Sequence, residues 1–207
     1  PDIKKISTFY HYPKPLTGKA LSSFIGFANY MRDFIPLFSR VAAPLEAIKS
    51  IKGTIVHLWS DECETAFIKL KKILCNYPVL SFPDFQLPFQ VATDASDVGV
   101  GAVLFQVIPE NNVKKYIAFA SQSLSKGQRS YPIFKKELLA VVFALEKFHH
   151  WLYGTKFTLF TDHQALVYLF TGKVNFKMLQ NWWHILLNYN FDIVHLPGVK
   201  NILPDLL

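Results

Sequence analysis

The sequence contains few cysteines, only Cys63 and Cys75 in 207 residues. Both fall on one expected helix, where twelve positions at about 1.5 Å each separate them by roughly 18 Å. A disulfide spans a much shorter distance, so the two thiols cannot pair with each other. The seven histidines are scattered, and no Cys/His cluster has the spacing of a zinc site. These absences give no support to a zinc module and favour a reducing compartment.

Long hydrophobic runs are also missing. No stretch of about 18 consecutive apolar residues occurs, so the sequence predicts no transmembrane helix and no membrane partner. The N-terminus lacks the apolar region of a signal peptide. Apolar residues nevertheless make up 51% of the chain, which excludes a disordered protein and allows a substantial core. We expect a soluble intracellular protein, or a piece of a longer one, because the chain starts without Met and stops at Leu207 with no closing element.

Acidic residues are fewer than basic ones, 15 against 22, and the net charge of +7 favours binding to a polyanion. Residues 1–78 carry eleven Lys and Arg against six Asp and Glu, and residues 79–207 carry eleven against nine. Without the four carboxylates discussed below, the second part is also strongly basic, so a basic body would surround an acidic pocket. An ordinary solvated basic surface explains the charge equally well.

Apolar residues at three- and four-residue steps predict a short amphipathic helix that ends before Pro36. They are Leu21, Phe24, Ile25, Ala28 and Met31, followed by Arg32. A second helix begins after Ser60, which can cap it, and ends near Pro78. We place a domain boundary there, which gives a mainly helical segment over residues 1–78 and a second domain over residues 79–207.

The second domain begins with three runs of β-branched and aromatic residues, which predict an antiparallel meander of strands. Helices and strands then alternate. The expected strands cover residues 86–93, 98–107, 113–120, 156–161 and 191–196, and the expected helices cover residues 134–153, 163–170 and 176–189. This order predicts an α/β fold with a mixed five-stranded sheet and helices packed on its faces.

Four carboxylates stand out against this framework. Asp94 and Asp162 each follow an apolar strand, and functional sites in α/β sheets gather where strands end. Glu137 shares a helical face with apolar residues, and a buried Glu destabilises a protein unless it has a partner or a metal. Asp205 has the weakest local signal, near the start of a terminal helix that Asn201 could cap. Singly, Asp94 could form a turn, Glu137 could complement the helix dipole, and Asp205 could lie on the surface.

Four carboxylates brought together would repel one another and raise each other's pKa values. Divalent cations relieve this repulsion, and hard oxygen ligands suit Mg²⁺ or Mn²⁺. Two such ions about 3.5–4 Å apart can activate a water molecule and stabilise the leaving oxygen of a phosphodiester. The pattern therefore predicts a two-metal nuclease with Asp94, Glu137, Asp162 and Asp205 as ligands.

An ordered series of motifs carries a family resemblance. The series is Thr93-Asp94-Ala95-Ser96 with residues 99–104, Lys136-Glu137 with residues 138–142, Leu152-Tyr153-Gly154, Thr161-Asp162-His163-Gln164, and Pro197-Gly198 with Asn201 and Asp205. It resembles the RNase H domain of gypsy-type LTR retrotransposon polyproteins. Upstream, residues 23–36 and Pro78-Val79-Leu80 resemble the tail of the reverse transcriptase that precedes that domain. Together the resemblance covers nearly the whole chain.

The resemblance implies an RNase H-like fold that cleaves the RNA strand of an RNA/DNA hybrid, with the four carboxylates as ligands of two Mg²⁺ ions that Mn²⁺ can replace. It implies that the first 55 or so residues are thumb-like and grip the duplex. It also implies that the rest of the polyprotein is a partner and that the protein could form a homodimer. The expected location is the cytoplasm, within virus-like particles or outside them, and the nucleus is the alternative. A Tyr-x-Asp-Asp polymerase motif is missing, so this chain cannot polymerise by itself.

Several positions depart from the family. Pro204-Asp205-Leu206-Leu207 stands where members usually have Ala-Asp-Ala-Leu-Ser-Arg, and a proline there removes an N–H and biases Leu203 away from helix. Residues 178–182 lack two arginines that members often have, and Asp33 replaces another. These losses should weaken phosphate contact and reduce the salt dependence of binding.

Other residues are candidates for contact with nucleic acid, namely Ser96, His163, Asn201 and Arg32. His163 could instead orient the neighbouring Asp162. His195 could assist product release, but a structural histidine at a strand end is the favoured interpretation.

Three functions remain open. The first is an active hybrid-specific endonuclease, which the complete set of carboxylates favours. The second is a degenerate or domesticated module that binds duplexes without cutting them, which Pro204 and the lost arginines favour. The third is another RNase H-like enzyme, such as a transposase or integrase, against which the thumb-like segment argues.

Overall fold

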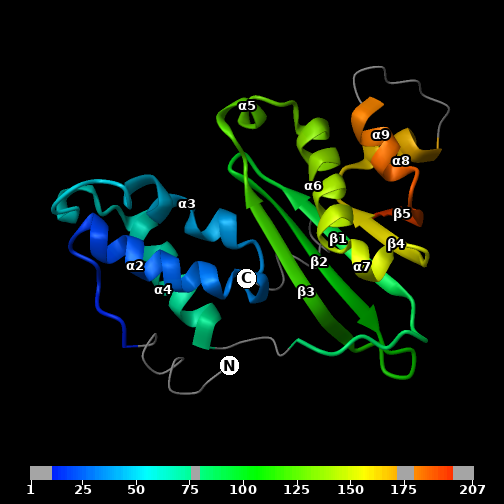
Figure 1. Cartoon of the computed structure of the whole chain (residues 1–207), viewed down its shortest axis with the longest axis horizontal. Coiled ribbons are helices and arrows are strands. Elements are labelled where there is room, and N and C mark those ends of the chain that lie inside the picture. The colour runs from blue at the N-terminus through cyan, green and yellow to red at the C-terminus, as the bar shows by residue number, and fades with distance from the viewer. Residues whose placement is uncertain (1–10, 76–79, 172–179, 198–207) are drawn as a thin grey trace.

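The computed structural model describes residues 11–75, 80–171 and 180–197, and Figure 1 shows a helical segment beside a five-stranded sheet. Each part has a hydrophobic cluster of its own, one among the helices and one between the sheet and the helices that cover it. The domain boundary that we predicted near Pro78 lies outside the described residues. Within the described ranges, no helix is both long and apolar enough to cross a membrane.

The helical segment packs three α-helices around one cluster. Its elements are α2 (Gly18–Tyr30), η1 (Arg32–Phe34), α3 (Phe38–Ile48), η2 (Val56–Leu58) and α4 (Asp61–Cys75). Helix α2 confirms the first predicted helix, because it buries Leu21, Phe24 and Ile25 and ends before Pro36. Helix α4 confirms the second, and its Cys63 amide donates a hydrogen bond to Ser60 Oγ at 3.3 Å.

Sequence reasoning missed α3, which contains a proline at position 44. A proline inside a helix removes one backbone hydrogen bond and usually bends or breaks the helix. Here the helix persists because Phe38, Val41, Ala42 and Leu45 lie on one side and are buried in the cluster of the helical segment. Tertiary packing has therefore outweighed the local preference.

The sheet is mixed, and its strand order is β3-β2-β1-β4-β5. The strands are β1 (Phe89–Ala95), β2 (Gly99–Val107), β3 (Lys114–Ser123), β4 (Lys156–Thr161) and β5 (Asn190–His195). The first three form the predicted antiparallel meander, and β4 and β5 run parallel to β1. The expected mixed five-stranded sheet with flanking helices is thereby confirmed.

The helices of the sheet domain differ in their bounds from the prediction. The long helix expected over residues 134–153 is divided into α6 (Ile133–Lys147) and α7 (His149–Leu152), because Phe148 leaves the helical conformation with φ −100° and ψ 14°. A short helix, α5 (Lys126–Arg129), was not predicted, although Ser125 and Gln128 form a capping box around it. Helices α8 (Gln164–Thr171) and α9 (Gln180–Leu186) follow, and residues 176–179 of the last predicted helix lie outside the described part.

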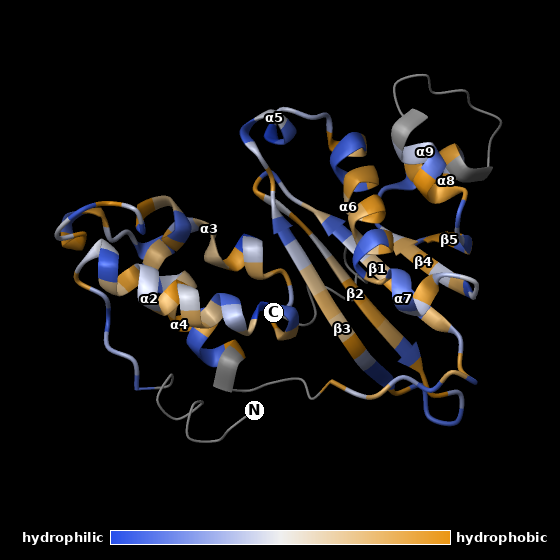
Figure 2. Cartoon of the chain, viewed as in Figure 1, coloured by the Kyte–Doolittle hydropathy of each residue, from blue (hydrophilic) through white to orange (hydrophobic). Residues whose placement is uncertain are grey.

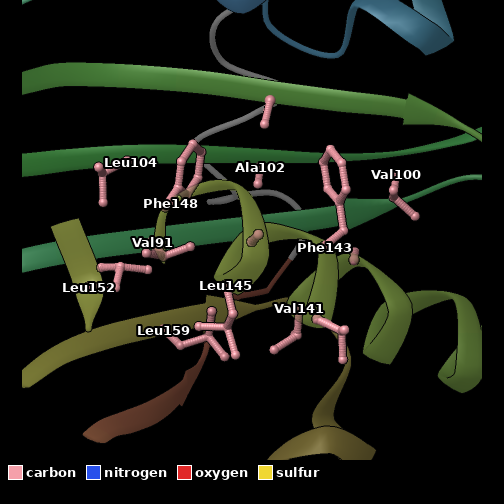
Figure 3. Packing of buried hydrophobic residues seen from close by; sticks show 14 of the residues in the cluster. Val91, Val100, Ala102, Leu104, Val141, Phe143, Leu145, Phe148, Leu152 and Leu159 are labelled. Carbon is pink, nitrogen blue, oxygen red and sulfur yellow. The ribbon is translucent and has the colours of Figure 1, made fainter. Parts of the chain in front are cut away.

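Helix α6 crosses one face of the sheet and forms the main core with it (Figure 3). Val141 and Leu145 from the helix pack with Val91, Leu104 and Leu159 from three strands. Strand β2 is buried along almost its whole length, and apolar residues run along it in Figure 2. The face of α6 that carries Glu137 is therefore the face turned toward the sheet.

The opposite face of the sheet receives the start of α3. Leu37, whose φ of 47° places it in the left-handed region, packs there against Val103, Phe105 and Phe119. A Cβ on Gly101 would lie 2.3 Å from Leu37 Cδ2, so only a glycine lets Leu37 approach this closely. No local pattern in the sequence predicts this contact.

We expect Gly101→Ala to weaken this docking. The added methyl group would overlap the buried Leu37 side chain, and overpacking of this kind destabilises a protein by about 1–3 kcal/mol. Urea denaturation should show a lower free energy of unfolding. A second change in the same chain, Leu37→Ala, should remove the clash and recover part of the lost stability. Gly127→Ala is the matched control, because a Cβ at Gly127 meets no atom within 4 Å. Equal losses in the two glycine variants would contradict this account of Gly101.

Candidate metal centre

Three of the four predicted carboxylates come together. Asp94, Glu137 and Asp162 each offer a carboxylate oxygen, and these oxygens all lie within 4.8 Å of one another. Asp94 belongs to β1, Glu137 to α6, and Asp162 follows the last residue of β4 directly. Asp205 and Asn201 lie outside the described residues, so their part in the site stays a prediction.

The sheet topology explains why the two aspartates meet. Strands β1 and β4 are parallel neighbours, and Ala92 pairs with Phe160 in their register. Both strands therefore end at the same edge of the sheet, where sites in α/β folds form. Asp94 and Asp162 each lie two positions beyond that pair, at the shared edge.

Glu137 reaches the site from the helix above the sheet. It lies near the start of α6, on the face that also carries the buried Val141, Ala144 and Leu145, as the sequence pattern predicted. Glu137 is only 3% exposed, and among the described residues its Oε2 is a buried oxygen with no hydrogen-bond partner. Desolvation, followed by repulsion from Asp162 and Asp94, raises the pKa of Glu137 from 4.5 to about 8.

Asp94 is also buried and has a raised pKa, but a cationic side chain lies beside it. It is 8% exposed, and desolvation, followed by repulsion from Asp162, raises its pKa. Arg40 of α3 opposes the rise, because its Nη1 lies 3.5 Å from Asp94 Oδ2. The Ala95 backbone lowers the pKa values of both Asp94 and Glu137 through hydrogen bonds.

The turn after β1 is fixed from two sides. Ser96 Oγ accepts hydrogen bonds from the Gly99 and Val98 amides at 3.1 and 3.4 Å. Lys136, which is almost fully buried on α6, donates to Asp97 Oδ1 at 2.7 Å. This ion pair ties the turn to the helix that carries Glu137. The predicted contact of Ser96 with nucleic acid is a separate matter and stays a prediction.

The two candidate histidines have backbone partners. His163 Nδ1 accepts a hydrogen bond from the Ala165 amide at 3.3 Å, at the start of α8. His195 Nε2 lies 3.0 Å from the Asp162 carbonyl oxygen, so the end of β5 is joined to the end of β4. The contact of His195 is of the kind expected for a structural histidine at a strand end, and the role of His163 stays a prediction.

Arg32 makes its described contacts inside the chain. Its guanidinium donates to the Asn29 side chain at 2.8 Å and to the Ser121 carbonyl oxygen on β3 at 2.9 Å. These bonds join the helical segment to the sheet. Its predicted contact with nucleic acid stays a prediction.

Sequence reasoning missed Arg40, which lies beside Asp94, and Lys136, which pairs with Asp97 in the turn after β1. Arg40 is 54 positions from Asp94 in the chain and lies on the helix that was not predicted. Lys136 adjoins Glu137, but adjacent helical residues face different directions, so the pattern gave no reason to place it at the site. Only the folded structure brings Arg40 to Asp94 and Lys136 to Asp97.

The donor set fits a hard divalent cation. All three side chains offer carboxylate oxygens, which Mg²⁺ and Mn²⁺ prefer over the nitrogen and sulfur ligands of zinc sites. The unpartnered Glu137 Oε2 lies where such an ion would provide the missing partner.

Comparison with known proteins places the chain among reverse-transcriptase and transposon Pol sequences. Residues 59–159 match the family described as the RNase H-like domain found in reverse transcriptase. The whole chain is 35% identical to part of the retrovirus-related Pol polyprotein from transposon opus of Drosophila melanogaster, and 33% identical to part of the Tf2-3 transposon polyprotein of Schizosaccharomyces pombe. The aligned regions make up 21% and 16% of these two relatives, so the chain spans a small part of their length.

Solved structures share the fold. The foamy viral protease-reverse transcriptase dRH in complex with double-stranded DNA superimposes on 95% of this chain with a TM-score of 0.72 and 20% identity, over 35% of that chain. The same viral protein in complex with an RNA/DNA hybrid superimposes on 97% with a TM-score of 0.70 and 22% identity, over 28% of that chain. The superposition includes the helical segment as well as the sheet, since it covers nearly all of this chain.

Proposed function

Because the chain carries an RNase H-like domain of the kind found in reverse transcriptase and is related to transposon Pol polyproteins, we propose that it cleaves the RNA strand of an RNA/DNA hybrid. The observation that carries the proposal is the buried Glu137 Oε2, which has no hydrogen-bond partner and belongs to a carboxylate beside Asp94 and Asp162. An acidic cluster that only stabilised the fold would have hydrogen-bond donors for such an oxygen. A cluster that binds a cation leaves the oxygen free for it.

Asp94, Glu137 and Asp162 would hold divalent cations, and we propose Asp205 as a fourth ligand. When bound, these ions would activate the attacking water and stabilise the leaving oxygen of the phosphodiester. The protein itself holds the carboxylates at fixed positions on two strand ends and one helix, so little reorganisation is needed during reaction. The salt bridge between Lys136 and Asp97 keeps the turn after Asp94 against α6.

A nucleic-acid duplex is the substrate that the charge of the chain supports. The net charge of +7 attracts a polyanion, while the carboxylates form a local acidic site within the basic body. The related foamy viral protein has been solved in complex with an RNA/DNA hybrid, and we extend that ligand to this chain as a proposal. The rest of a Pol polyprotein would then be its covalent partner.

The test is cleavage of a labelled RNA/DNA hybrid by the wild-type chain. We expect products from the RNA strand with Mg²⁺ or Mn²⁺ and none with EDTA, because the proposed chemistry needs the cation. Single-stranded RNA and double-stranded DNA of the same sequence are the control substrates and should stay intact. If the chain binds the hybrid but leaves it uncut with either ion, the alternative of a binding module is correct. The Pro204-Asp205 sequence is the feature that favours this alternative.

A further inference from the structure

Arg40 connects the helical segment to the candidate metal centre. Its Nη1 lies 3.5 Å from Asp94 Oδ2, although Arg40 belongs to α3 and Asp94 to the sheet. The Arg40 side chain is 53% exposed, whereas that of Asp94 is only 11% exposed. A carboxylate of the site therefore has a counter-ion that comes from outside the sheet domain and is itself accessible to solvent.

The docking of α3 holds Arg40 in this place. Leu37 packs over Gly101, and Gly101 is the residue that pairs with Asp94 in the register of β1 and β2. Two positions further, Ser39 joins β3, since its amide and its Oγ each lie 3.4 Å from Ser121 Oγ. With Leu37 and Ser39 fixed on the sheet, the next residue along the chain reaches Asp94.

We propose that Arg40 and a divalent cation compete for Asp94, and that Arg40 moves to a backbone phosphate of the nucleic acid when the cation binds. This inference rests on the proposed function. Asp94 cannot serve both cations well, because a guanidinium and a divalent ion on the same carboxylate repel each other. A guanidinium released in this way is a strong ligand for phosphate, which it can bind through two parallel hydrogen bonds.

The surroundings of Arg40 leave room for this movement. A surface hollow of about 670 Å³ lies between α3 and α4, and Arg40 lines it together with Pro44, Thr65 and Lys69. Asp61 and Glu62 also line it, so the hollow is of mixed charge. The guanidinium can thus leave Asp94 without displacing the protein core. Arg40 would be a substrate-binding residue that the helical segment supplies to the sheet domain.

Cation affinity gives the first test, because it does not depend on cleavage. Mn²⁺ binding to wild type and Arg40→Gln should be measured by isothermal titration calorimetry. We expect Arg40→Gln to lower the Mn²⁺ dissociation constant about three- to fivefold, the range for a partly exposed ion pair that no longer competes. Lys69→Gln is the matched control, since it removes one positive charge from the same hollow and leaves the pair between Arg40 and Asp94 intact. It should leave the constant within about twofold of wild type.

Duplex affinity gives the second test. The probe is a hybrid whose RNA strand carries 2′-O-methyl groups, chosen to resist cleavage, and its binding is measured over a range of salt concentrations. With Mn²⁺, Arg40→Gln should weaken binding about three- to tenfold and reduce the salt slope by about 0.7–0.9, as expected for one lost phosphate contact. With EDTA, wild type and Arg40→Gln should bind alike, because Asp94 then holds Arg40.

The outcomes separate the two proposals. If wild type binds no Mn²⁺, the proposed function fails and the role of Arg40 fails with it. If wild type binds Mn²⁺ and Arg40→Gln binds it with the same or lower affinity, only the role of Arg40 is overturned. An equal loss of duplex binding with Mn²⁺ and with EDTA would also overturn it, because the cation would then not control where Arg40 binds.

Discussion

Asp94→Asn is expected to reduce Mg²⁺-dependent cleavage of an RNA/DNA hybrid at least about 1,000-fold, which corresponds to about 4 kcal/mol of transition-state stabilisation. The substitution keeps the shape of the side chain but removes one of the three negative charges that the cluster offers to a cation. Asp94 is buried, so water cannot replace the lost carboxylate. Initial rates on a labelled hybrid, at saturating Mg²⁺, measure the effect.

Asp192→Asn is the control for this prediction. Asp192 lies on β5 and forms an exposed salt bridge with Lys156 at 2.8 Å. The control therefore makes the same Asp-to-Asn change at an exposed position outside the carboxylate cluster. We expect its cleavage rate to stay within about twofold of wild type, since exposed pairs contribute little. Hybrid affinity should be retained in Asp94→Asn. A variant that still cuts at a tenth of the wild-type rate would show that Asp94 is not essential.

The sheet and three carboxylates of the site were predictable because they depend on local sequence patterns. Asp94 and Asp162 follow apolar runs that predict strands, and sites in α/β sheets gather where strands end. Glu137 follows the same helical period as Val141 and Leu145, which fixes the direction of its carboxylate before any tertiary contact is known. For these residues, secondary structure and fold class were sufficient to bring the oxygens together.

Other features depend on contacts between distant segments, and no local pattern reveals them. Helix α3 contains Pro44, and it forms because its apolar side is buried against neighbouring helices. Since α3 was missed, the approach of Leu37 to Gly101 and of Arg40 to Asp94 could not be anticipated. The break at Phe148 is of the same kind, because the apolar periodicity continues through it from α6 into α7.

Glu137→Gln is expected to stabilise the metal-free protein at high pH while it abolishes cation binding. Folding raises the pKa of Glu137 from 4.5 to about 8, so the folded state holds the proton more tightly than the unfolded state. The free energy of unfolding therefore falls as pH rises from about 4.5 to about 8, by up to about 4 kcal/mol for this group. Glutamine does not titrate and escapes this loss. At pH 8 in EDTA, the variant should be more stable than wild type by about 2–4 kcal/mol, and at pH 4.5 the two should be similar.

Urea denaturation at the two pH values measures this difference, and Glu146→Gln provides the matched control. Glu146 lies on the same helix but is exposed, so its replacement should change stability little at either pH. Mg²⁺ should then stabilise wild type at pH 8 and leave Glu137→Gln almost unchanged, because a ligand stabilises only the state that binds it. If wild type and Glu137→Gln are equally stable at pH 8 in EDTA, ionisation of the buried Glu137 carboxyl group does not destabilise the fold. The unpartnered Glu137 Oε2 would then no longer support a cation site.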